Sequence, residues 1–416
     1  MAFIQNPLIA VAISFIFLGI LLYKRVNLGI TLNATALLLA LLAVDLEKIP
    51  TVIRDTTLDV LTVSIVIATF GIMMLSQLYK ETKLINQLSE SLSRIINNPK
   101  IVLSLLPAVM GFLPVAGGAL MSAPLVDAEA EKIGLKRQKK AYVNFWFRHA
   151  IFPIYPLSQV LIVAAALAGI SIASIILRQI PVVIVMIIVG YAIGFWKIPK
   201  TKNPKASEKK DSTNSSDLRS FLTAFLPILV TIIVAISLGL AGFNLSQQGL
   251  DVLIATFVGV FVLVAISKPS FRVVSKPFKS WGIYGITLAA YGAFLLGSVI
   301  KATEIPGIFE TFAANGSIDS TLLLTAIPAA SGVLTASALG GVSISMPILG
   351  GIIALSPKTA SLIYMSAYLG YVMSPTHLCL AFTADYFECS LEKIYKYAIP
   401  SFIATFTTTL LIYFLI

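Results

Sequence analysis

Long apolar stretches separated by short polar segments dominate the pattern along the chain. A helix needs about 20 predominantly apolar residues to cross a bilayer. The stretches that come close to this length are 8–23, 28–44, 58–79, 142–169, 172–196, 218–241, 250–267, 281–300, 359–387 and 395–416. The pattern therefore predicts an all-α polytopic membrane protein in the cell (cytoplasmic) membrane, with the lipid bilayer as its surroundings.

Two further apolar segments, 101–127 and 319–352, are interrupted near their middle by proline and glycine, in GFLPVAGGALMSAP and SGVLTASALGGVSISMP. Two short helices that meet at such a tip would form a re-entrant hairpin, which enters and leaves the membrane on the same side. Non-helical backbone survives at membrane depth only where protein buries it or where it lines a wet cavity. We therefore predict one re-entrant hairpin in each segment.

The positions of the basic residues favour this arrangement. If both hairpins are re-entrant and the N-terminus lies outside, 24 of the 30 Lys and Arg residues fall in cytoplasmic loops, where such residues are normally enriched. Arg148 stays in the membrane, and Lys48, Arg54, Arg178, Lys301 and Lys358 fall outside. A hairpin that crossed would place KRQKK (136–140) and the polar linker 197–217 on opposite sides. We expect both termini to be extracytoplasmic.

The two halves of the chain resemble each other. FGIMMLSQLYKETKL (70–84) aligns with YGAFLLGSVIKATEI (291–305) at an offset of 221 residues, and Pro107 then corresponds to Pro328. An amphipathic run follows in each half, starting near residues 84 and 305, and is predicted to lie in the interface. A matched order of glycine, lysine and proline over this length indicates an internal repeat.

Each half contains five predicted spans and one hairpin. Because five is odd, the second copy must begin on the opposite side of the membrane. The sequence therefore predicts two inverted repeats, 1–196 and 218–416, joined by a cytoplasmic linker, 197–217. Inverted repeats with broken helices near the midplane are the architecture of secondary transporters.

Prolines lie near the centre of the predicted helices 142–169 and 359–387. Pro153 and Pro156, within WFRHAIFPIYP, remove two backbone donors, so the first helix is expected to unwind around them. Pro375, in GYVMSPTHLCL, is the corresponding residue of the second half. We therefore predict one broken helix near the midplane in each half.

Arg148 lies eight residues past Lys140, which is about 12 Å of helix rise into the membrane. An ionisable residue at this depth usually faces a cavity or a partner. Arg148 is therefore a candidate for contacting a substrate anion or for gating. The alternative is a structural salt bridge, with Asp127 or Asp385 as the partner, or a side chain that snorkels to the interface.

Further candidate binding residues lie at the predicted breaks and hairpin tips. Histidine titrates near neutral pH and could carry a proton. Backbone amides at half-helix N-termini suit anions, whereas hydroxyls and C-terminal carbonyls suit Na⁺. The candidates besides Arg148 are Gly117, Gly118, Ser122, Asn144, His149, Tyr155, Ser337, Gly340, Gly341, Ser343, Ser345, Ser374, Thr376 and His377. The competing explanations are a hydrogen-bonded packing histidine and close helix packing through small residues.

Composition narrows the function classes. Hydrophobic residues make up 57% of the chain and charged residues 12%, about half the charged share of a soluble domain. The net charge of +11 is explained by cytoplasmic loops, so nucleic acid is not an expected partner. Cys379 and Cys389 form no CxxC motif, and their spacing indicates neither a disulfide framework nor a zinc site. HExxH and P-loop motifs are missing. We therefore expect no catalytic activity and no cofactor beyond Na⁺ or H⁺ as a coupling ion.

Three motifs, LPVAGGALMSAPLV, NFWFRHAIFPIYP and GYVMSPTHLCL, resemble those of an uncharacterised family of prokaryotic integral membrane proteins, the domain-of-unknown-function 401 family. That family is grouped with the ion-transporter superfamily, alongside citrate, gluconate and dicarboxylate carriers. The resemblance implies inverted repeats, each with a hairpin and an unwound helix, and a homodimer. A clear Ser-Asn-Thr tip signature is missing, so the Na⁺ sites of the dicarboxylate/sodium symporters are not transferred to this chain.

The leading hypothesis is a secondary active transporter of a small anionic solute, an organic acid or an inorganic anion. The solute would be symported with Na⁺ or H⁺ by an elevator or rocking movement. A cation/proton antiporter is the first alternative, weakened by the lack of an unmistakable mid-membrane Asp or Glu. A membrane-embedded enzyme or lipid-handling protein is the further alternative, for which the sequence offers no catalytic constellation.

Overall fold

The computed structural model describes residues 3–4, 6–96, 98–112, 118–198, 215–240, 248–303 and 319–416, and the regular structure within these ranges is helical throughout. Seven helical stretches in this part of the chain, with the broken stretch Arg137–Ala168 counted as one, are long and apolar enough to cross a membrane. The predicted all-α polytopic fold is confirmed, and the protein is a multi-pass membrane protein.

The first half contains ten α-helices and one 3₁₀ turn among the described residues. They are α1 (Pro7–Tyr23), α2 (Leu28–Ala43), α3 (Ile49–Leu58), α4 (Val60–Glu81), α5 (Leu84–Ile95), α6 (Pro99–Gly111), α7 (Gly118–Glu131), α8 (Arg137–Ala150), η1 (Phe152–Ile154), α9 (Gln159–Ala168) and α10 (Ile172–Gly194). The predicted spans of this half match helices to within a few residues. The sequence reading missed α3, because its ten residues are too few and too polar to resemble a span.

The second half repeats much of this order. Its described elements are α11 (Ser215–Leu240), α12 (Leu250–Ser267), α13 (Phe271–Val274), η2 (Pro277–Lys279), α14 (Trp281–Ala302), α16 (Ser320–Thr335), α17 (Ala338–Gly350), α18 (Pro357–Met373), α19 (Leu378–Tyr386) and α20 (Leu391–Leu415). The series α14, α16, α17, α18, α19 and α20 corresponds in order to α4, α6, α7, α8, α9 and α10. This order is what an internal repeat requires, whereas the inversion of the two copies stays a prediction.

The two predicted hairpins are each a pair of short helices in contact, α6 with α7 and α16 with α17. Helices α6 and α17 have 13 residues each, which is about 20 Å of rise, against about 30 Å for the hydrocarbon core. Neither helix is long enough to cross the membrane alone. The tip of the first hairpin, including Gly117, lies outside the described residues, and the re-entrant path itself stays a prediction.

Backbone contacts hold the first helix of each hairpin against a broken helix. A Cβ added to Gly111 on α6 would lie 2.3 Å from the carbonyl oxygen of Arg148 on α8. In the second half, a Cβ on Gly332 of α16 would lie 2.2 Å from the carbonyl oxygen of Ala367 on α18. Only glycine permits such a close approach of two helices. These crossings position each hairpin beside the broken helix of its own half.

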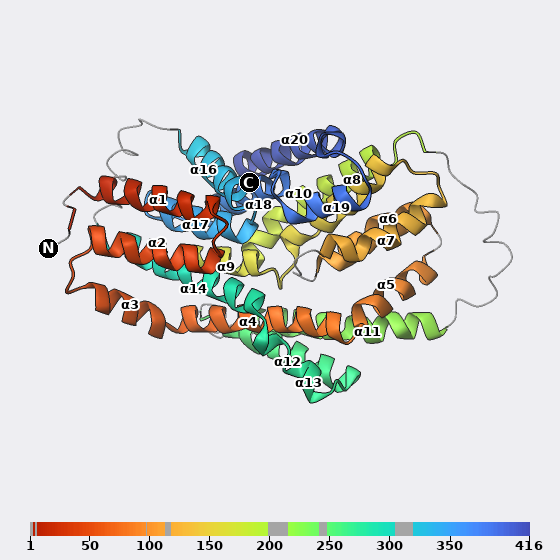
Figure 1. The fold of residues 1–416 in the computed structure, drawn as a ribbon, viewed down its shortest axis with the longest axis horizontal. Coiled ribbons are helices and arrows are strands. Elements are labelled where there is room, and N and C mark those ends of the chain that lie inside the picture. The colour runs from red at the N-terminus through yellow and green to blue at the C-terminus, as the bar shows by residue number, and fades with distance from the viewer. Residues whose placement is uncertain are drawn as a thin grey trace.

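The two halves interlock instead of folding as separate domains. Helix α2 packs against α14, and α4 packs against α12 (Figure 1). The central core is built from α8, α9, α17 and α18, and its largest fully buried side chains include Trp146, Tyr364 and Tyr368. The broken helices of both halves therefore lie inside one shared core.

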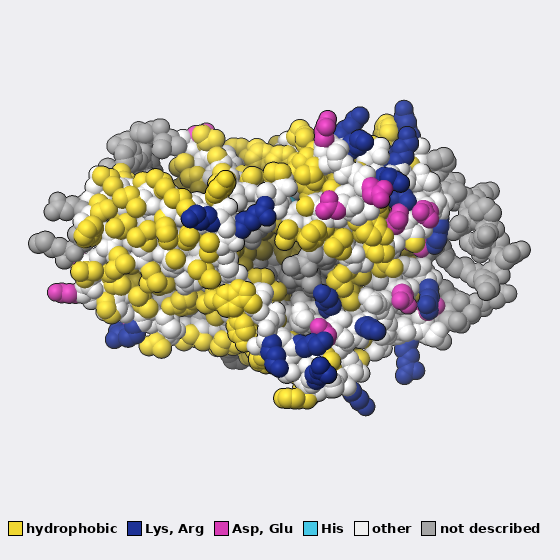
Figure 2. All heavy atoms as spheres, viewed as in Figure 1, with side chains coloured by type: hydrophobic (Ala, Val, Ile, Leu, Met, Phe, Trp, Pro, Cys, Tyr) yellow, Lys and Arg dark blue, Asp and Glu magenta, His cyan; other side chains and the backbone are white. Residues whose placement is uncertain are grey.

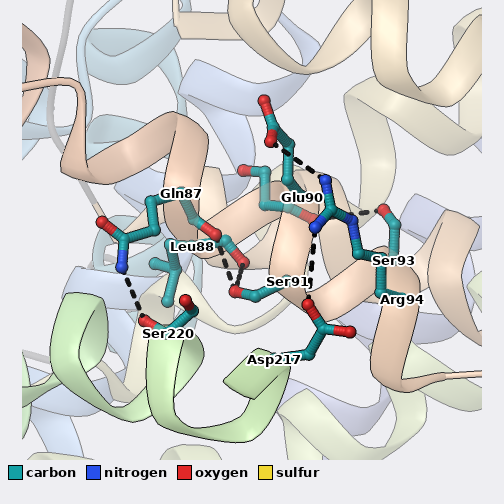
Figure 3. A network of polar contacts seen from close by, with 9 residues as sticks. Gln87, Leu88, Glu90, Ser91, Ser93, Arg94, Asp217 and Ser220 are labelled. Carbon is teal, nitrogen blue, oxygen red and sulfur yellow. Dashed lines mark hydrogen bonds and ion pairs between the residues drawn. The ribbon is translucent and has the colours of Figure 1, made fainter. Parts of the chain in front are cut away.

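Helix α5 shows that the amphipathic run of the first half is a helix, whereas its position in the membrane interface stays a prediction. It buries Leu84, Leu88 and Leu92 and contacts α11, which follows the linker. The polar side of the contact is shown in Figure 3, where Arg94 approaches Asp217 at 3.4 Å and Glu90 at 3.7 Å. The expected counterpart after residue 304 and most of the linker 197–217 lie outside the described residues.

Charged and apolar side chains are segregated along the molecule. On the face shown in Figure 2, apolar side chains cover the left part, over α1, α2 and α3. Lysine, arginine and acidic side chains gather from the middle to the right, around α5 to α8, α11 and α13. One end of the protein is thus suited to a charged, wet surface, and the apolar part is suited to lipid.

Candidate functional site

A cavity of about 310 Å³ lies where the two broken helices meet the second hairpin. Its lining comes from both halves and includes Arg148, His149 and Gln159 of the first and Ser337, Tyr371, His377 and Cys379 of the second. Residues from the start of α2 and from α14 complete it. It is the candidate functional site.

The first broken helix is interrupted as the prolines predict. Helix α8 ends at Ala150, the chain passes through η1, and α9 begins at Gln159. Two tyrosines of α18 donate hydrogen bonds to carbonyls at this break: Tyr368 to His149 O at 2.8 Å and Tyr364 to Pro153 O at 3.3 Å. A buried carbonyl without a partner would be costly. The second half therefore stabilises the break of the first.

The second broken helix is also interrupted at its proline. Helix α18 ends at Met373, just before the Pro375 region, and α19 begins at Leu378. The Ser374 hydroxyl donates to Val333 O at 2.8 Å, and Tyr395 donates to Met373 O at 3.0 Å. The break is thus tied to the second hairpin on one side and to α20 on the other.

Arg148 and His149 bring charge and imidazole chemistry to the end of α8. Both side chains are buried, with 6% and 4% of their surface exposed, and both line the cavity. His149 Nδ1 lies 2.7 Å from Phe145 O, and Nε2 lies 3.4 Å from the hydroxyl of Tyr371. Because a carbonyl only accepts, Nδ1 carries the proton in the first contact.

Three half-helices begin at this cavity. Gln159 and Val160 open α9, Ala338 and Leu339 open α17, and Leu378 and Cys379 open α19, and all six line the cavity. The N-terminus of a helix carries a partial positive charge from its aligned peptide dipoles. None of the described residues that line the cavity is an aspartate or a glutamate. Four helices also end at the cavity, near Gly111, His149, Ala336 and Tyr371, and their C-termini carry the opposite partial charge, so the net positive charge of the described lining comes from Arg148.

Some predicted site residues lie together but away from the cavity. Asn144 accepts a hydrogen bond from the Ser122 hydroxyl at 2.6 Å, and its amide donates to Ala119 O and to Thr383. This buried network joins α7, α8 and α19. Tyr155 packs its ring 4.8 Å from that of Phe112, in a separate apolar cluster.

The predicted residues of the second hairpin have mixed surroundings. Ser337 lines the cavity and caps α17 by accepting from Gly340 N at 3.1 Å. A Cβ on Gly341 would lie 3.0 Å from Gly332 backbone atoms, so close helix packing accounts for this glycine. Ser343 is buried in α17, and Ser345 donates to Gly341 O. The remaining predicted site residues lie outside this hairpin: Gly118 starts α7, and exposed Thr376 contacts Ser374.

The acidic residues considered for pairing with Arg148 have other surroundings. Asp127 forms an ion pair with Lys140 at 2.5 Å, with 10% of the lysine side chain exposed. Asp385 is exposed on α19, and Glu388 pairs with Arg137 at 2.7 Å on the surface. Asp385 and Glu388 are both exposed.

Among the residues that line the cavity, four with polar or nucleophilic side chains were not predicted site residues: Asn27, Gln159, Tyr371 and Cys379. Gln159 is the first residue of α9 and Cys379 is the second of α19. A search for polar or nucleophilic side chains directly after each proline break would have found these two. Asn27 and Tyr371 reach the cavity through tertiary packing, and no local signal marks them.

The sequence profile of DUF401, described as a protein of unknown function, matches residues 8–416. The chain belongs to the DUF401 family. The family resemblance of its three motifs is therefore confirmed, whereas the grouping with citrate, gluconate and dicarboxylate carriers stays a prediction. No curated protein sequence matches this DUF401 protein.

Solved structures resemble this DUF401 protein in fold. The Alcanivorax borkumensis YdaH transporter, whose topology is described as unusual, superposes with a TM-score of 0.61 at 14% identity, over 89% of each chain. Neisseria gonorrhoeae MtrF, which represents a class of antimetabolite efflux pumps, gives a TM-score of 0.55 at 11% identity. The second match covers 88% of this chain and 83% of MtrF. At such low identities the likeness shows the fold alone.

Proposed function

We propose that this DUF401 protein is a secondary active transporter of a small anionic solute, coupled to Na⁺ or H⁺. The observation that carries the proposal is the charge of the central cavity. Arg148 and the N-termini of α9, α17 and α19 border one space, and the described residues around it include no carboxylate. A buried arginine beside half-helix N-termini, with no carboxylate in the described lining, attracts an anion.

The position of the site supports transport over simple binding. The cavity lies between the broken helices of both halves, and its lining includes the start of α17 in the second hairpin. In secondary transporters, half-helix N-termini point at the anionic substrate near the midplane, and one repeat moves against the other around it. YdaH and MtrF, which share the fold, are respectively a transporter and a member of a class of efflux pumps.

The polypeptide has a surface consistent with the proposed topology. The basic stretch 136–140, at the start of α8, belongs to the charged part of the molecule, at the end opposite the apolar helices α1 to α3. With that end in the cytoplasm, both termini are extracytoplasmic and the positive-inside rule is satisfied. A cation/proton antiporter would need a carboxylate at the site, which the described lining does not provide.

The test measures anion binding and melting temperature on the same preparations. A thermal-shift screen against organic and inorganic anions, with and without Na⁺, identifies a ligand, because a ligand that binds the native state raises its apparent stability. Arg148→Gln is then expected to weaken that ligand by about 1.5–3 kcal/mol, the scale of a hydrogen bond to a charged group. Arg148→Lys restores part of the affinity, since an ammonium lacks the bidentate fork.

Arg54→Gln is the matched control, because Arg54 lies on α3 with 67% of its side chain exposed. It should leave anion affinity unchanged. If Arg148→Gln lowers the melting temperature but binds the anion as the parent does, Arg148 is structural and the proposed role is refuted. Flux of the identified anion into proteoliposomes, driven by a Na⁺ or a pH gradient, decides which ion is coupled.

A further inference from the structure

Three metal-ligating side chains meet at the wall of the cavity. The chain contains 2 histidines and 2 cysteines. Both histidines and one of the cysteines, Cys379, lie so close together that their ligand atoms are all within 4.8 Å of one another. All three are buried, and they come from different halves of the chain, His149 from the end of α8 and the other two from around the start of α19.

His149 presents a nitrogen lone pair toward this cluster. Its Nδ1 donates to Phe145 O at 2.7 Å, which leaves the neutral ring with its lone pair on Nε2. Metal-binding histidines commonly have this arrangement, in which one ring nitrogen donates to a backbone carbonyl and the other binds the ion. Nε2 also lies 3.4 Å from the Tyr371 hydroxyl, which is at the long end of hydrogen-bond distances.

His377 is the least satisfied member of the cluster. Its side chain is 2% exposed, and neither ring nitrogen makes a hydrogen bond of normal length and angle to a described residue, apart from a poorly formed contact with the Val372 backbone. Buried polar atoms are otherwise bonded as a rule. The ring lies 4.8 Å from that of His149 and 4.0 Å from that of Tyr371, measured between centroids. An ion between the two histidines would give a ring nitrogen of His377 a well-formed bond.

The distances are compatible with a tetrahedral site after small side-chain rotations. Zn–N bonds of about 2.0–2.1 Å and Zn–S bonds of about 2.3 Å place the ligand atoms about 3.3–3.6 Å apart. The observed limit of 4.8 Å therefore exceeds these separations by at most about 1.2–1.5 Å. Two imidazoles and a thiolate suit Zn²⁺ among the common ions. Three protein ligands leave the fourth position open, and here it faces the cavity.

Charge determines what occupies that fourth position. The Cys379 thiol loses its proton on binding, so Zn²⁺ with one thiolate keeps a net charge of +1. Arg148 and three helix N-termini surround the same cavity. We propose that His149, His377 and Cys379 bind Zn²⁺ or a similar transition-metal ion, with an anion from the cavity as the fourth ligand. The ion links the broken helix of the first half to that of the second.

The test is a Co²⁺ titration of the full-length protein in detergent with a phosphine reductant and chloride. Co²⁺ bound to a thiolate produces a sulfur-to-metal charge-transfer band in the near ultraviolet. We expect one equivalent to give this band and Zn²⁺ to displace it. Cys379→Ser should abolish the band. His377→Gln removes a direct ligand and should therefore lower the affinity for Zn²⁺ by at least 10–100-fold, which is the loss that removal of an outer-shell partner causes.

Cys389→Ser is the matched control. Cys389 lies between α19 and α20, outside the cluster, and burial raises the pKa of its thiol, which makes it a poor ligand at neutral pH. The band should persist in this variant. A parent protein without the band, a band that survives Cys379→Ser, or a band lost in Cys389→Ser would each overturn the proposal, and the parent result stands even if a variant fails to fold.

The inference shares the cavity with the proposed anion site, but the two are tested separately. Metal binding is read without any flux measurement, and the anion screen is run after chelation with EDTA. A protein that binds Co²⁺ through Cys379 but binds none of the organic and inorganic anions of the screen supports the metal site and refutes the transport proposal. Anion binding by a protein that gives no cobalt band supports the transport proposal and refutes the metal site.

Discussion

The contact between Gly111 and Arg148 allows a quantitative prediction. The added Cβ of Gly111→Ala would lie 2.3 Å from the Arg148 carbonyl oxygen and 3.3 Å from its carbonyl carbon. Real Cβ atoms do not approach another heavy atom closer than 3.0 Å, so α6 and α8 must separate by about 0.7 Å. Both partners are helix backbone, and neither can rotate away. One methyl group therefore has to widen a helix crossing at the wall of the cavity.

Overpacking of this kind costs about 1–3 kcal/mol. With about 2.1 cal/mol/K of unfolding entropy per residue, a chain of 416 residues loses roughly 1 °C of melting temperature per kcal/mol. We therefore expect Gly111→Ala to melt about 1–3 °C below the parent. Gly332→Ala, whose Cβ would lie 2.2 Å from Ala367 O, should behave alike if the two halves are equivalent.

Gly19→Ala provides the control, because a Cβ at this position on α1 has nothing within 4 Å. Alanine in a helix interior is favoured over glycine by about 0.5–1 kcal/mol, so this variant should melt at or above the parent temperature. Melting is followed by scanning calorimetry in one detergent at one scan rate, since membrane proteins often unfold irreversibly. Equal melting temperatures for Gly111→Ala and Gly19→Ala would refute the argument from the backbone contact.

Three further predictions concern ion pairing, the break in α8 and the topology. Asp127→Asn should destabilise the protein by about 1–3 kcal/mol, because it leaves Lys140 buried without its nearest carboxylate. Glu388→Gln, which removes the exposed ion pair with Arg137, should cost less than about 1 kcal/mol in the same melting assay. Tyr368→Phe should lower the free energy of unfolding by about 1 kcal/mol, because it removes the donor to His149 O. Tyr23→Phe, at a side chain that is 90% exposed, should leave stability unchanged. Equal melting temperatures for the two variants would contradict the role of Tyr368 at the break. Ser207→Cys, with Cys379 and Cys389 replaced by serine, should resist an impermeant maleimide in intact cells, and labelling would show that the linker is not cytoplasmic.

The breaks in the two long helices could be predicted because proline acts locally. Pro153 and Pro375 lie in segments that are otherwise apolar, and a missing N–H disrupts a helix whatever surrounds it. The observed ends at Ala150 and Met373 follow from this local rule. The short helix α3 was missed because its ten residues are too few and too polar to resemble a membrane span.

The sequence alone determined the class of the protein, its helical segments and the order in which they recur, because apolar length, proline and glycine act within one segment. The composition of the cavity was decided only by tertiary structure. Asn144 and Ser122 have the chemistry of a binding site, yet packing places them in a network with Thr383 away from it. His149 and Cys379, 230 positions apart in the sequence, lie side by side because the two halves interlock. Which side chains share a cavity depends on contacts between distant segments, and no local pattern encodes those contacts.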